Sequence, residues 1–270
     1  MPLGVSPPPP ATASELIEQL FAQSWDDALG RFRSPFAFRG RPAGDDTLVT
    51  SLYRLAHGAD LRTVELALLR NFRKYAHHFA GTGVDSIWHW LALGQHHGLP
   101  TRLMDWTYSP LVALHFATQN PDDLTRDGVV WCVNFVEANK RLPRRLKAIL
   151  DNEHSQTLTI DGLAAFATLD AFDRLASDSF VVFLEPPSLD SRIMNQFALF
   201  SLMPGPDVQL GSWLTTHQEL VRKVVVPARL KWEVRDKLDQ VNINERTLFP
   251  GLEGLSRWLA RYYTPRAARD

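Results

Sequence analysis

The densest group of side chains that could do chemistry lies between Gln95 and Pro110, with the sequence Gln-His-His-Gly-Leu-Pro-Thr-Arg-Leu-Met-Asp-Trp-Thr-Tyr-Ser-Pro. Gly98 and Pro100 favour a turn after a helix, and turns held between rigid elements are favoured places for ligand-binding side chains. We therefore take the polar and aromatic residues of this block as candidate binding residues. They are His96, His97, Thr101, Arg102, Asp105, Trp106 and Ser109. Arg102 and Asp105 could instead pair with one another or with backbone groups, and Trp106 could be a core residue.

Metal binding is the first hypothesis for a turn rich in histidine. The pairs His96/His97 and His77/His78 are adjacent, however, and lack the i, i+4 spacing that places two imidazoles on one helix face. The single cysteine, Cys132, excludes a multi-cysteine zinc site. We expect no metal site, and hydrogen-bonded packing at a helix end is the simpler role for His96 and His97.

Arg39 ends an apolar strand that we expect over residues 36–40. A guanidinium there can project into a cleft and bind phosphate through two hydrogen bonds, while Gly40 would allow a ligand to approach the backbone. The alternative is an ion pair with an acidic residue such as Asp105 or Asp45.

Several well-defined catalytic motifs are missing. The sequence has no G-x-x-x-x-G-K-[ST], no G-x-G-x-x-G and no G-x-S-x-G. Cys132 lies inside an apolar run, where a thiol is usually inert. Nucleophilic catalysis by serine or cysteine therefore has no support.

The composition is that of an ordinary soluble globule. The 270 residues include 29 Lys and Arg against 30 Asp and Glu, a net charge of −1, with 45% hydrophobic residues. The balanced charge gives no general attraction to nucleic acid or to an acidic membrane. No apolar run approaches the roughly 18 residues that span a bilayer. One cysteine favours a reducing compartment, so we expect a cytoplasmic protein.

The order of expected elements predicts an α+β fold, because helices come first, strands follow and helices return at the end. We expect a disordered lead-in over residues 1–12, which contain the run Pro7–Pro10, and a single domain over residues 13–265 with a helical insertion at about 55–98. The expected helices cover residues 15–24 (capped by Ser14), 61–80, 87–93, 111–118 (capped by Ser109), 229–238 and 252–261. The expected strands cover residues 36–40, 101–106, 128–136, 180–184, 196–202 and 223–226.

Four ordered motifs resemble the FRG domain family. Phe38-Arg39-Gly40 is similar to the signature that names the family, and Gln95–Ala117 resembles its Q-H-x-G-x-x-T-R-L-L-D-W-T block. Residues 192–200 resemble an R-I-x-x-Q-x-G-x-F element, with Ala198 in place of the usual glycine. Residues 248–255 are similar to a closing L-F-P-x-L-x-G-L. The resemblance extends from about residue 25 to 260.

The order of these motifs also resembles the ADP-ribosyltransferase superfamily. That resemblance implies a core of split mixed or antiparallel sheet with a helical subdomain, and NAD as a substrate. Arg39 and Gly40 would then hold the diphosphate, Trp106 or Phe200 would stack on or bury nicotinamide, and Gln196 would contact the ribose. Cleavage of the nicotinamide–ribose bond passes through an oxocarbenium-like state, which preorganised polar groups can stabilise.

What the superfamily resemblance implies is mono-ADP-ribosylation of a macromolecule, either protein or nucleic acid, and a role as a toxin or defence effector. Gln196 is a neutral amide and cannot be a general base, and Glu185 or Glu219 is a possible carboxylate in its place. A local basic face at Arg141, Arg144, Arg145 and Lys147 could serve a nucleic-acid acceptor, or could be a solvated helix.

Two other functions stay open. One is a non-catalytic module that binds a nucleotide or a partner, which the missing catalytic carboxylate favours. The other is a histidine- or metal-dependent hydrolase built on His96, His97 and Asp105.

Overall fold

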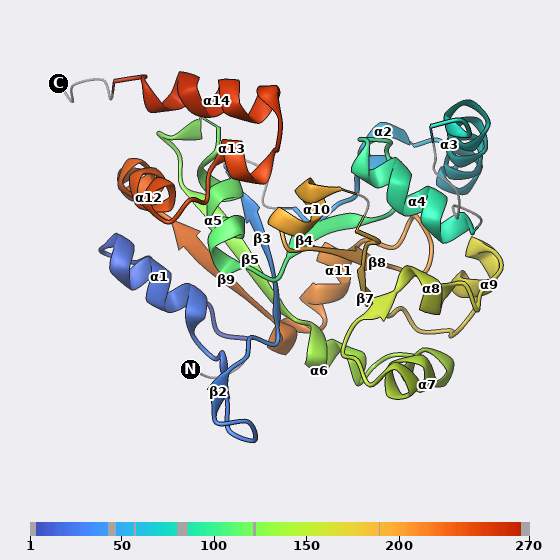
Figure 1. The fold of residues 1–270 in the computed structure, drawn as a ribbon. Helices are drawn as coiled ribbons and strands as arrows, with labels where there is room; N and C mark the ends of the chain where they lie inside the picture. The colour runs from blue at the N-terminus through green and yellow to red at the C-terminus, as the bar shows by residue number, and fades with distance from the viewer. Residues whose placement is uncertain are drawn as a thin grey trace.

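The protein was analysed as a computed structural model, which describes residues 4–42, 47–56, 58–79, 86–120, 123–188 and 190–265. In this part of the chain, seven strands form one mixed sheet in the order β6-β7-β8-β4-β3-β5-β9, and two more form a small separate hairpin, β1-β2 (Figure 1). The strands are β1 (Trp25–Asp26), β2 (Arg31–Phe32), β3 (Phe36–Arg41), β4 (Met104–Thr107), β5 (Gly128–Asn134), β6 (Leu158–Thr159), β7 (Val182–Glu185), β8 (Ala198–Leu202) and β9 (Val221–Val226). β6 and β7 are parallel and the other neighbours are antiparallel, which confirms the α+β fold class.

The large sheet consists of two well-paired halves with a weak join. β3 pairs with β5 from Phe36↔Asn134 to Arg41↔Val129, and β4 pairs with β8 along its whole length. Between β3 and β4 the register contains one described pair, Phe38↔Thr107. The two strands therefore diverge beyond this pair, over Arg39–Arg41 and the facing part of β4.

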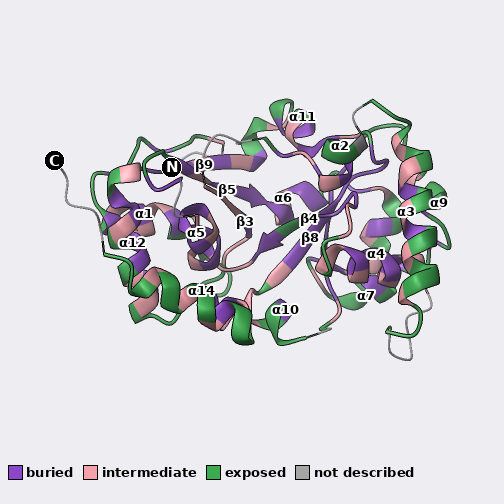
Figure 2. Ribbon diagram, turned by 90° about the horizontal axis from the view of Figure 1, so that it is seen from above, coloured by how far each residue is buried: buried purple, intermediate pink, exposed green. Residues whose placement is uncertain are grey.

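Helices cover both faces of the sheet (Figures 1 and 2). They are α1 (Ala13–Phe21), α2 (Ser51–Ala56), α3 (Leu61–Ala76), α4 (Ile87–His96), α5 (Pro110–Thr118), α6 (Phe135–Asn139), α7 (Arg144–Glu153), α8 (Ile160–Leu163), α9 (Leu169–Asp173), α10 (Ser191–Asn195), α11 (Leu210–Thr215), α12 (Ala228–Gln240), α13 (Glu245–Leu248) and α14 (Leu252–Tyr262), with a 3-10 turn η2 (Gln218–Leu220). No helix of the described residues combines the length and apolar character needed to cross a bilayer.

Strand alternation decides which core each side chain joins. On β3, Phe36 and Phe38 pack with α1, α5 and α12. Ala37 points to the opposite face, where it joins Trp131 of β5 and side chains of α6 and α11. The expectation that Phe36 and Phe38 share one side of the strand is confirmed.

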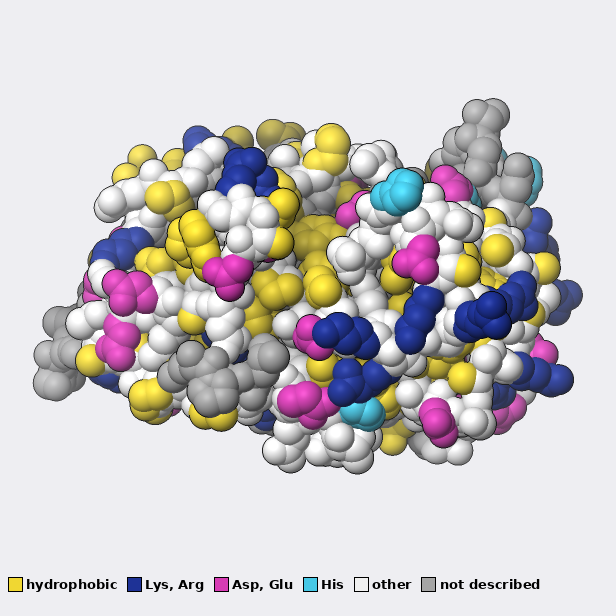
Figure 3. Space-filling view, turned by 90° about the horizontal axis from the view of Figure 1, so that it is seen from below, with side chains coloured by type: hydrophobic (Ala, Val, Ile, Leu, Met, Phe, Trp, Pro, Cys, Tyr) yellow, Lys and Arg dark blue, Asp and Glu magenta, His cyan; other side chains and the backbone are white. Residues whose placement is uncertain are grey.

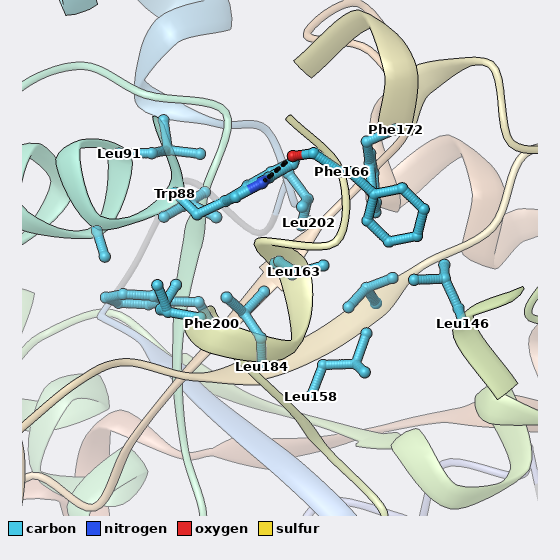
Figure 4. Packing of buried hydrophobic residues seen from close by; sticks show 14 of the residues in the cluster. Trp88, Leu91, Leu146, Leu158, Leu163, Phe166, Phe172, Leu184, Phe200 and Leu202 are labelled. Atoms are coloured by element: carbon cyan, nitrogen blue, oxygen red, sulfur yellow. Dashed lines mark hydrogen bonds between the residues drawn. The ribbon is translucent and has the colours of Figure 1, made fainter. Parts of the chain in front are cut away.

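A third core supports the other half of the sheet. Phe200 and Leu202 of β8 and Leu184 of β7 pack against α4, α7, α8 and α9 (Figure 4). Trp88 of α4 is 1% exposed, and its Nε1 donates to the Phe166 carbonyl at 2.7 Å. This core fixes α4 over β8, while α5 is fixed over β3.

The expected elements are found, and local hydrogen bonds explain several of the differences at their ends. α1 begins at Ala13 because the Thr12 hydroxyl, rather than Ser14, caps it by accepting from Glu15 N at 3.1 Å. The Ser109 cap of α5 is confirmed, with Val112 N donating to its hydroxyl.

Several strand ends were also misplaced, and local bonds explain three of them. β4 begins at Met104 because Leu103 N donates to the Thr101 hydroxyl and not to a neighbouring strand. β5 ends at Asn134, whose side chain caps α6. β8 begins at Ala198, because Phe197 has a φ of 47° and its N–H bonds back into α10.

Residues 4–12 contain no helix or strand and lie along β9 and α12. Lys223 N donates to the Ser6 hydroxyl at 3.0 Å, and Arg229 donates to the Pro10 carbonyl at 2.7 Å. Helices α2, α3 and α4 lie between β3 and β4 in the chain, and α3 and α4 fall within residues 55–98, where we expected a helical insertion.

Candidate functional site

A cavity of about 310 Å³ lies where β3 and β4 diverge. The register places Phe38, Thr107 and Ala198 side by side on one face of the sheet, and all three line the cavity. Its walls come from β3, β4, β8, α4, α5 and α10. The lining residues are Phe38, Arg39, Gly40, Arg41, Pro42, Gln95, His96, Asp105, Trp106, Thr107, Phe116, Gln119, Arg192, Ile193, Gln196, Ala198 and Phe200.

The cavity brings together most of the candidate residues from three distant parts of the sequence. Those that line it are Arg39, Gly40, His96, Asp105, Trp106, Gln196 and Phe200. Four others are outside its lining, namely His97, Thr101, Arg102 and Ser109.

Arg39 reaches from β3 to β4. Its Nη1 donates to the main-chain carbonyl of Asp105 at 2.5 Å. The contact between these two residues is therefore made through the backbone of Asp105, while Asp45, the other expected partner, lies outside the described residues. The guanidinium bridges the gap between the diverging strands.

The close packing of α5 requires a glycine at position 40, which we did not expect. A Cβ at this position would stand 1.8 Å from the Ala113 carbonyl and 2.7 Å from Ala117 N, both on α5. The glycine allows α5 to pack directly on β3. The helix thus fills the Cβ side of Gly40, and Gly40 still lines the cavity.

Asp105 places its side chain, which is exposed, at the cavity. Gln95 Nε2 lies 3.0 and 2.9 Å from its two carboxylate oxygens. Gln95 Oε1 in turn accepts from the Thr101 hydroxyl at 2.5 Å. Thr101 is 1% exposed and so acts on the site from behind, through Gln95.

Trp106 is a core residue whose indole is already engaged. It is 4% exposed, its Nε1 donates to the Ser201 hydroxyl at 2.9 Å, and its ring packs edge-on against Phe183 at 5.7 Å. These contacts lie on the opposite face from Asp105, as strand alternation requires. Besides Trp106, the aromatic residues that line the cavity are Phe38, Phe116 and Phe200.

Gln196 lies at the end of α10 and not at the start of a strand, as we had expected. Its Nε2 donates to the Leu248 carbonyl at 2.8 Å, and its own carbonyl accepts from the Thr107 hydroxyl at 2.7 Å. The amide group thus ties the 192–200 motif to the 248–255 motif, and the backbone ties both to β4.

Arg102 is buried, 3% exposed, behind the cavity. Its guanidinium pairs with both oxygens of Glu65 on α3 and, at 2.6 Å, with Asp173 on α9. Burial raises the pKa of Glu65, against the opposing effect of the Arg102 hydrogen bonds. Arg102 therefore holds two helices to the loop that precedes β4, and its guanidinium is engaged in these ion pairs.

The two histidines differ in position. His96 Nε2 lies 2.8 Å from Asp190 Oδ2, just before α10, so the imidazole links α4 to α10 at the rim of the cavity. Burial acts to raise the pKa of Asp190, but hydrogen bonds from Ile193 N and from His96 outweigh it and hold the pKa below its usual value. His97 is exposed and packs edge-on against His96.

Sequence reasoning missed five lining residues that carry charge or hydrogen-bonding groups, namely Arg41, Gln95, Thr107, Gln119 and Arg192. Each lies inside or next to a motif, which was the available signal. A second cavity, of about 640 Å³, shares Phe116 and Gln119 with the first, and also Arg192. Arg192 and Arg257 both lie over the Phe249 ring in that region, at 5.2 and 5.6 Å.

Neither expected substitute carboxylate lines the cavity. Glu185 accepts from the Tyr108 hydroxyl at 2.8 Å, and Glu219 pairs with Arg141 at 2.7 Å. Lys and Arg side chains gather on one half of the face shown in Figure 3, the half that contains α7. Within the expected basic face, Arg145 packs over the Phe166 ring, 4.9 Å from its centre.

Among the described residues, no group of three or more His, Cys, Asp or Glu side chains is arranged to hold a metal ion. Cys132 is fully buried on β5, and burial raises the pKa of its thiol to about 12. Its predicted inert character agrees with this environment.

The fold and the cavity define an α+β protein whose sheet opens at its join into an arginine-lined site. Residues 34–126 match the family model of the FRG domain. The match includes the Phe-Arg-Gly motif at residue 38 and the Gln95–Ala117 block, and it confirms the FRG resemblance for this segment. No curated protein and no solved structure matched the chain.

Proposed function

We propose that the protein binds NAD in the cavity between β3 and β4 and transfers its ADP-ribosyl group to an acceptor. The observation that carries this proposal is the convergence of Arg39, Arg41 and Arg192 on one cavity that also contains Asp105. Guanidinium groups match the geometry and charge of a diphosphate. The split between β3 and β4 supports the likeness to ADP-ribosyltransferases that the motif order implied.

The size of the site also supports a dinucleotide. The first cavity, about 310 Å³, is at the small end for ligand sites, but the second continues from it. Arg192 lies at the junction and belongs to both. A diphosphate near Arg192 would allow one nucleoside half to occupy each cavity, with Phe200 and Phe38 beside the nicotinamide half.

The transfer needs no redox partner. The bond between C1′ of the ribose and the nicotinamide nitrogen breaks, and its electron pair leaves with neutral nicotinamide. C1′ then forms a bond to an oxygen or nitrogen of the acceptor, whose proton is released. Water as the acceptor gives ADP-ribose, nicotinamide and a proton.

The acceptor that we propose is a macromolecule, protein or nucleic acid, modified in the cytoplasm. A toxin or defence role follows from the ADP-ribosyltransferase likeness alone. If it holds, expression should slow growth, and Arg39→Gln and Gln196→Ala should each relieve the effect. Equal growth inhibition by the wild type and both variants would contradict this role.

Calorimetry with NAD and an assay for released nicotinamide test the proposal directly. Wild type should bind NAD and release nicotinamide. Arg39→Gln removes one charged donor and should raise the Kd roughly tenfold or more, since hydrogen bonds to charged groups contribute about 1.5–3 kcal/mol. Arg174→Gln is the matched control, because Arg174 is 79% exposed and lies outside both cavities. Absence of NAD binding by the wild type would refute the proposal.

A non-catalytic nucleotide-binding module is the second candidate. The observation in its favour is that the Trp106 indole and the Gln196 amide nitrogen, two of the three expected catalytic groups, are engaged in internal hydrogen bonds. NAD binding without release of nicotinamide would select this function.

A further inference from the structure

A chain of hydrogen bonds connects Thr101, Gln95 and Asp105 behind the cavity. The number of donors and acceptors on each side chain determines which group donates in each bond. The Thr101 hydroxyl accepts from Leu103 N at 3.0 Å, and it has one proton to donate. That proton points to Gln95 Oε1, 2.5 Å away. The Gln95 side chain is thereby oriented with its oxygen towards Thr101.

The orientation of Gln95 then determines what Asp105 receives. With Oε1 facing Thr101, the Gln95 nitrogen faces Asp105, where it lies 3.0 and 2.9 Å from the two carboxylate oxygens. The reverse orientation would place an amide oxygen against a carboxylate and is excluded by repulsion. Asp105 is thus held as a hydrogen-bond acceptor, and its remaining lone pairs are available to the cavity.

This network is anchored in the protein interior. Thr101 N donates to the Ser51 hydroxyl at 3.2 Å, and the Thr101 carbonyl accepts from Leu52 N at 3.3 Å, both at the start of α2. Holding the exposed side chain of Asp105 in one position costs conformational entropy. A solvated surface carboxylate needs no such support, whereas a carboxylate that must meet a bound ligand does.

Asp105 also lies next to Arg39, one of the arginines that line the cavity. Its main-chain carbonyl accepts from Arg39 Nη1 at 2.5 Å. A ligand whose diphosphate is bound by Arg39 would therefore have its adjacent ribose close to the Asp105 carboxylate. Asp105 is the one carboxylate among the described residues that line this cavity.

We infer that Asp105 is the catalytic carboxylate of this site, and that Gln95 and Thr101 are its positioning residues. The inference rests on the proposed function. The Asp105 carboxylate accepts a hydrogen bond from a ribose hydroxyl and stabilises the positive charge at C1′ as the C1′–N bond breaks. It then takes the proton of the attacking acceptor, which passes on to water, so that the carboxylate is restored.

The first test compares Asp105→Asn with the wild type in the nicotinamide-release assay, with NAD affinity measured in parallel. Asparagine has the same shape and keeps the main-chain carbonyl that Arg39 contacts. We expect kcat to fall by roughly 10²–10⁴-fold, the usual contribution of a general base, with little change in Kd. Wild-type release by Asp105→Asn would overturn the inference and leave the proposed function standing.

The second test separates positioning from stability. Thr101→Val removes the proton that orients Gln95 and should lower kcat by roughly tenfold with KM little changed, whereas Thr101→Ser keeps the hydroxyl and should restore activity. Thr118→Val is the matched stability control, since Thr118 is also 1% exposed, donates to the Leu114 carbonyl and is outside this cavity.

The outcomes are distinct. Equal loss of activity in Thr101→Val and Thr118→Val at matched loss of stability would overturn the positioning role, and so would failure of Thr101→Ser to restore kcat. A wild-type protein that releases no nicotinamide would refute the proposed transfer, and this inference with it.

Discussion

The carbonyl oxygen of Ala113 lies 1.8 Å from the position that a Cβ at Gly40 would occupy. Helix α5 therefore packs on the backbone of β3, next to Arg39. Gly128 on the neighbouring strand β5 is similarly close, with its Cβ position 2.9 Å from the Ala117 carbonyl. These two glycines bring α5, with Phe116, against the cavity.

Gly40→Ala should therefore destabilise the fold. A methyl group must push α5 away from β3, and overpacking of this kind costs roughly 1–3 kcal/mol or more. Urea unfolding measures the loss. Gly211→Ala is the control, because its Cβ would meet no atom closer than 3.4 Å and alanine favours the helix. Equal stability of Gly40→Ala and wild type would show that α5 does not pack this closely.

Arg102→Met should be among the most damaging single changes. It leaves Glu65 and Asp173, 2% and 3% exposed, without the cation that pairs with both, and breaking a buried ion pair costs about 3–5 kcal/mol. Arg62→Met is a graded control, since Arg62 also pairs with Asp173 but is half exposed. Thermal unfolding should show a large decrease in Tm for Arg102→Met and a small decrease for Arg62→Met. The opposite order would contradict the prediction.

His115 should make stability fall as the pH is lowered. Burial lowers its pKa well below 6.5, and the nearby cations Arg235 and Arg261 lower it further, against smaller opposing effects of the Ile243 backbone and Asp239. Below pH 6.5 the unfolded chain takes up a proton that the folded protein does not. The contribution of His115 to the free energy of unfolding is therefore fully present above pH 6.5. It decreases as the pH falls below 6.5, by at most about 1.4 kcal/mol per pH unit.

Urea unfolding at about pH 7.5 and about pH 5.5 isolates this effect when wild type is compared with His115→Gln. The variant should show a smaller loss of stability over this interval, because glutamine does not titrate. The same pH dependence in both proteins would show that other groups cause it.

Trp106→Phe should change stability more than ligand binding. It removes the hydrogen bond from the indole to Ser201 and leaves that buried hydroxyl without its donor, at a cost of about 1–3 kcal/mol. NAD affinity should stay close to that of the wild type. A large loss of affinity in a stably folded variant would restore the stacking role that the sequence suggested.

The sequence predicted the presence of helices and strands better than the residues at which they begin and end. It also predicted which residues line the cavity better than it predicted the role of each. Hydrophobic alternation placed Phe36 and Phe38 correctly because it records which face is buried. The start of β4 depended on the bond from Leu103 N to the Thr101 hydroxyl, and periodicity does not report such a local bond.

The roles of site residues depended on partners far away in the sequence. Arg102 was a candidate binding residue, and the structure pairs it with Glu65 and Asp173, which lie on helices that are separate in the chain. Asp105 was recognised as a binding residue, but its importance follows from the orientation of Gln95, which needs coordinates. Residue type and spacing predict which residues lie near the cavity, and the side-chain contacts in the structure indicate the role of each.

The pairing of the strands has a consequence for any attempt to isolate the segment that matches the FRG family. Residues 34–126 include β3 and β4, but β5 and β8, with which they form nearly all their ladder bonds, come later in the chain. A polypeptide trimmed to that segment would carry two bare strand edges that are prone to self-association. The segment that matches the family is therefore shorter than the unit that completes the sheet, and expression trials should retain the chain through β9.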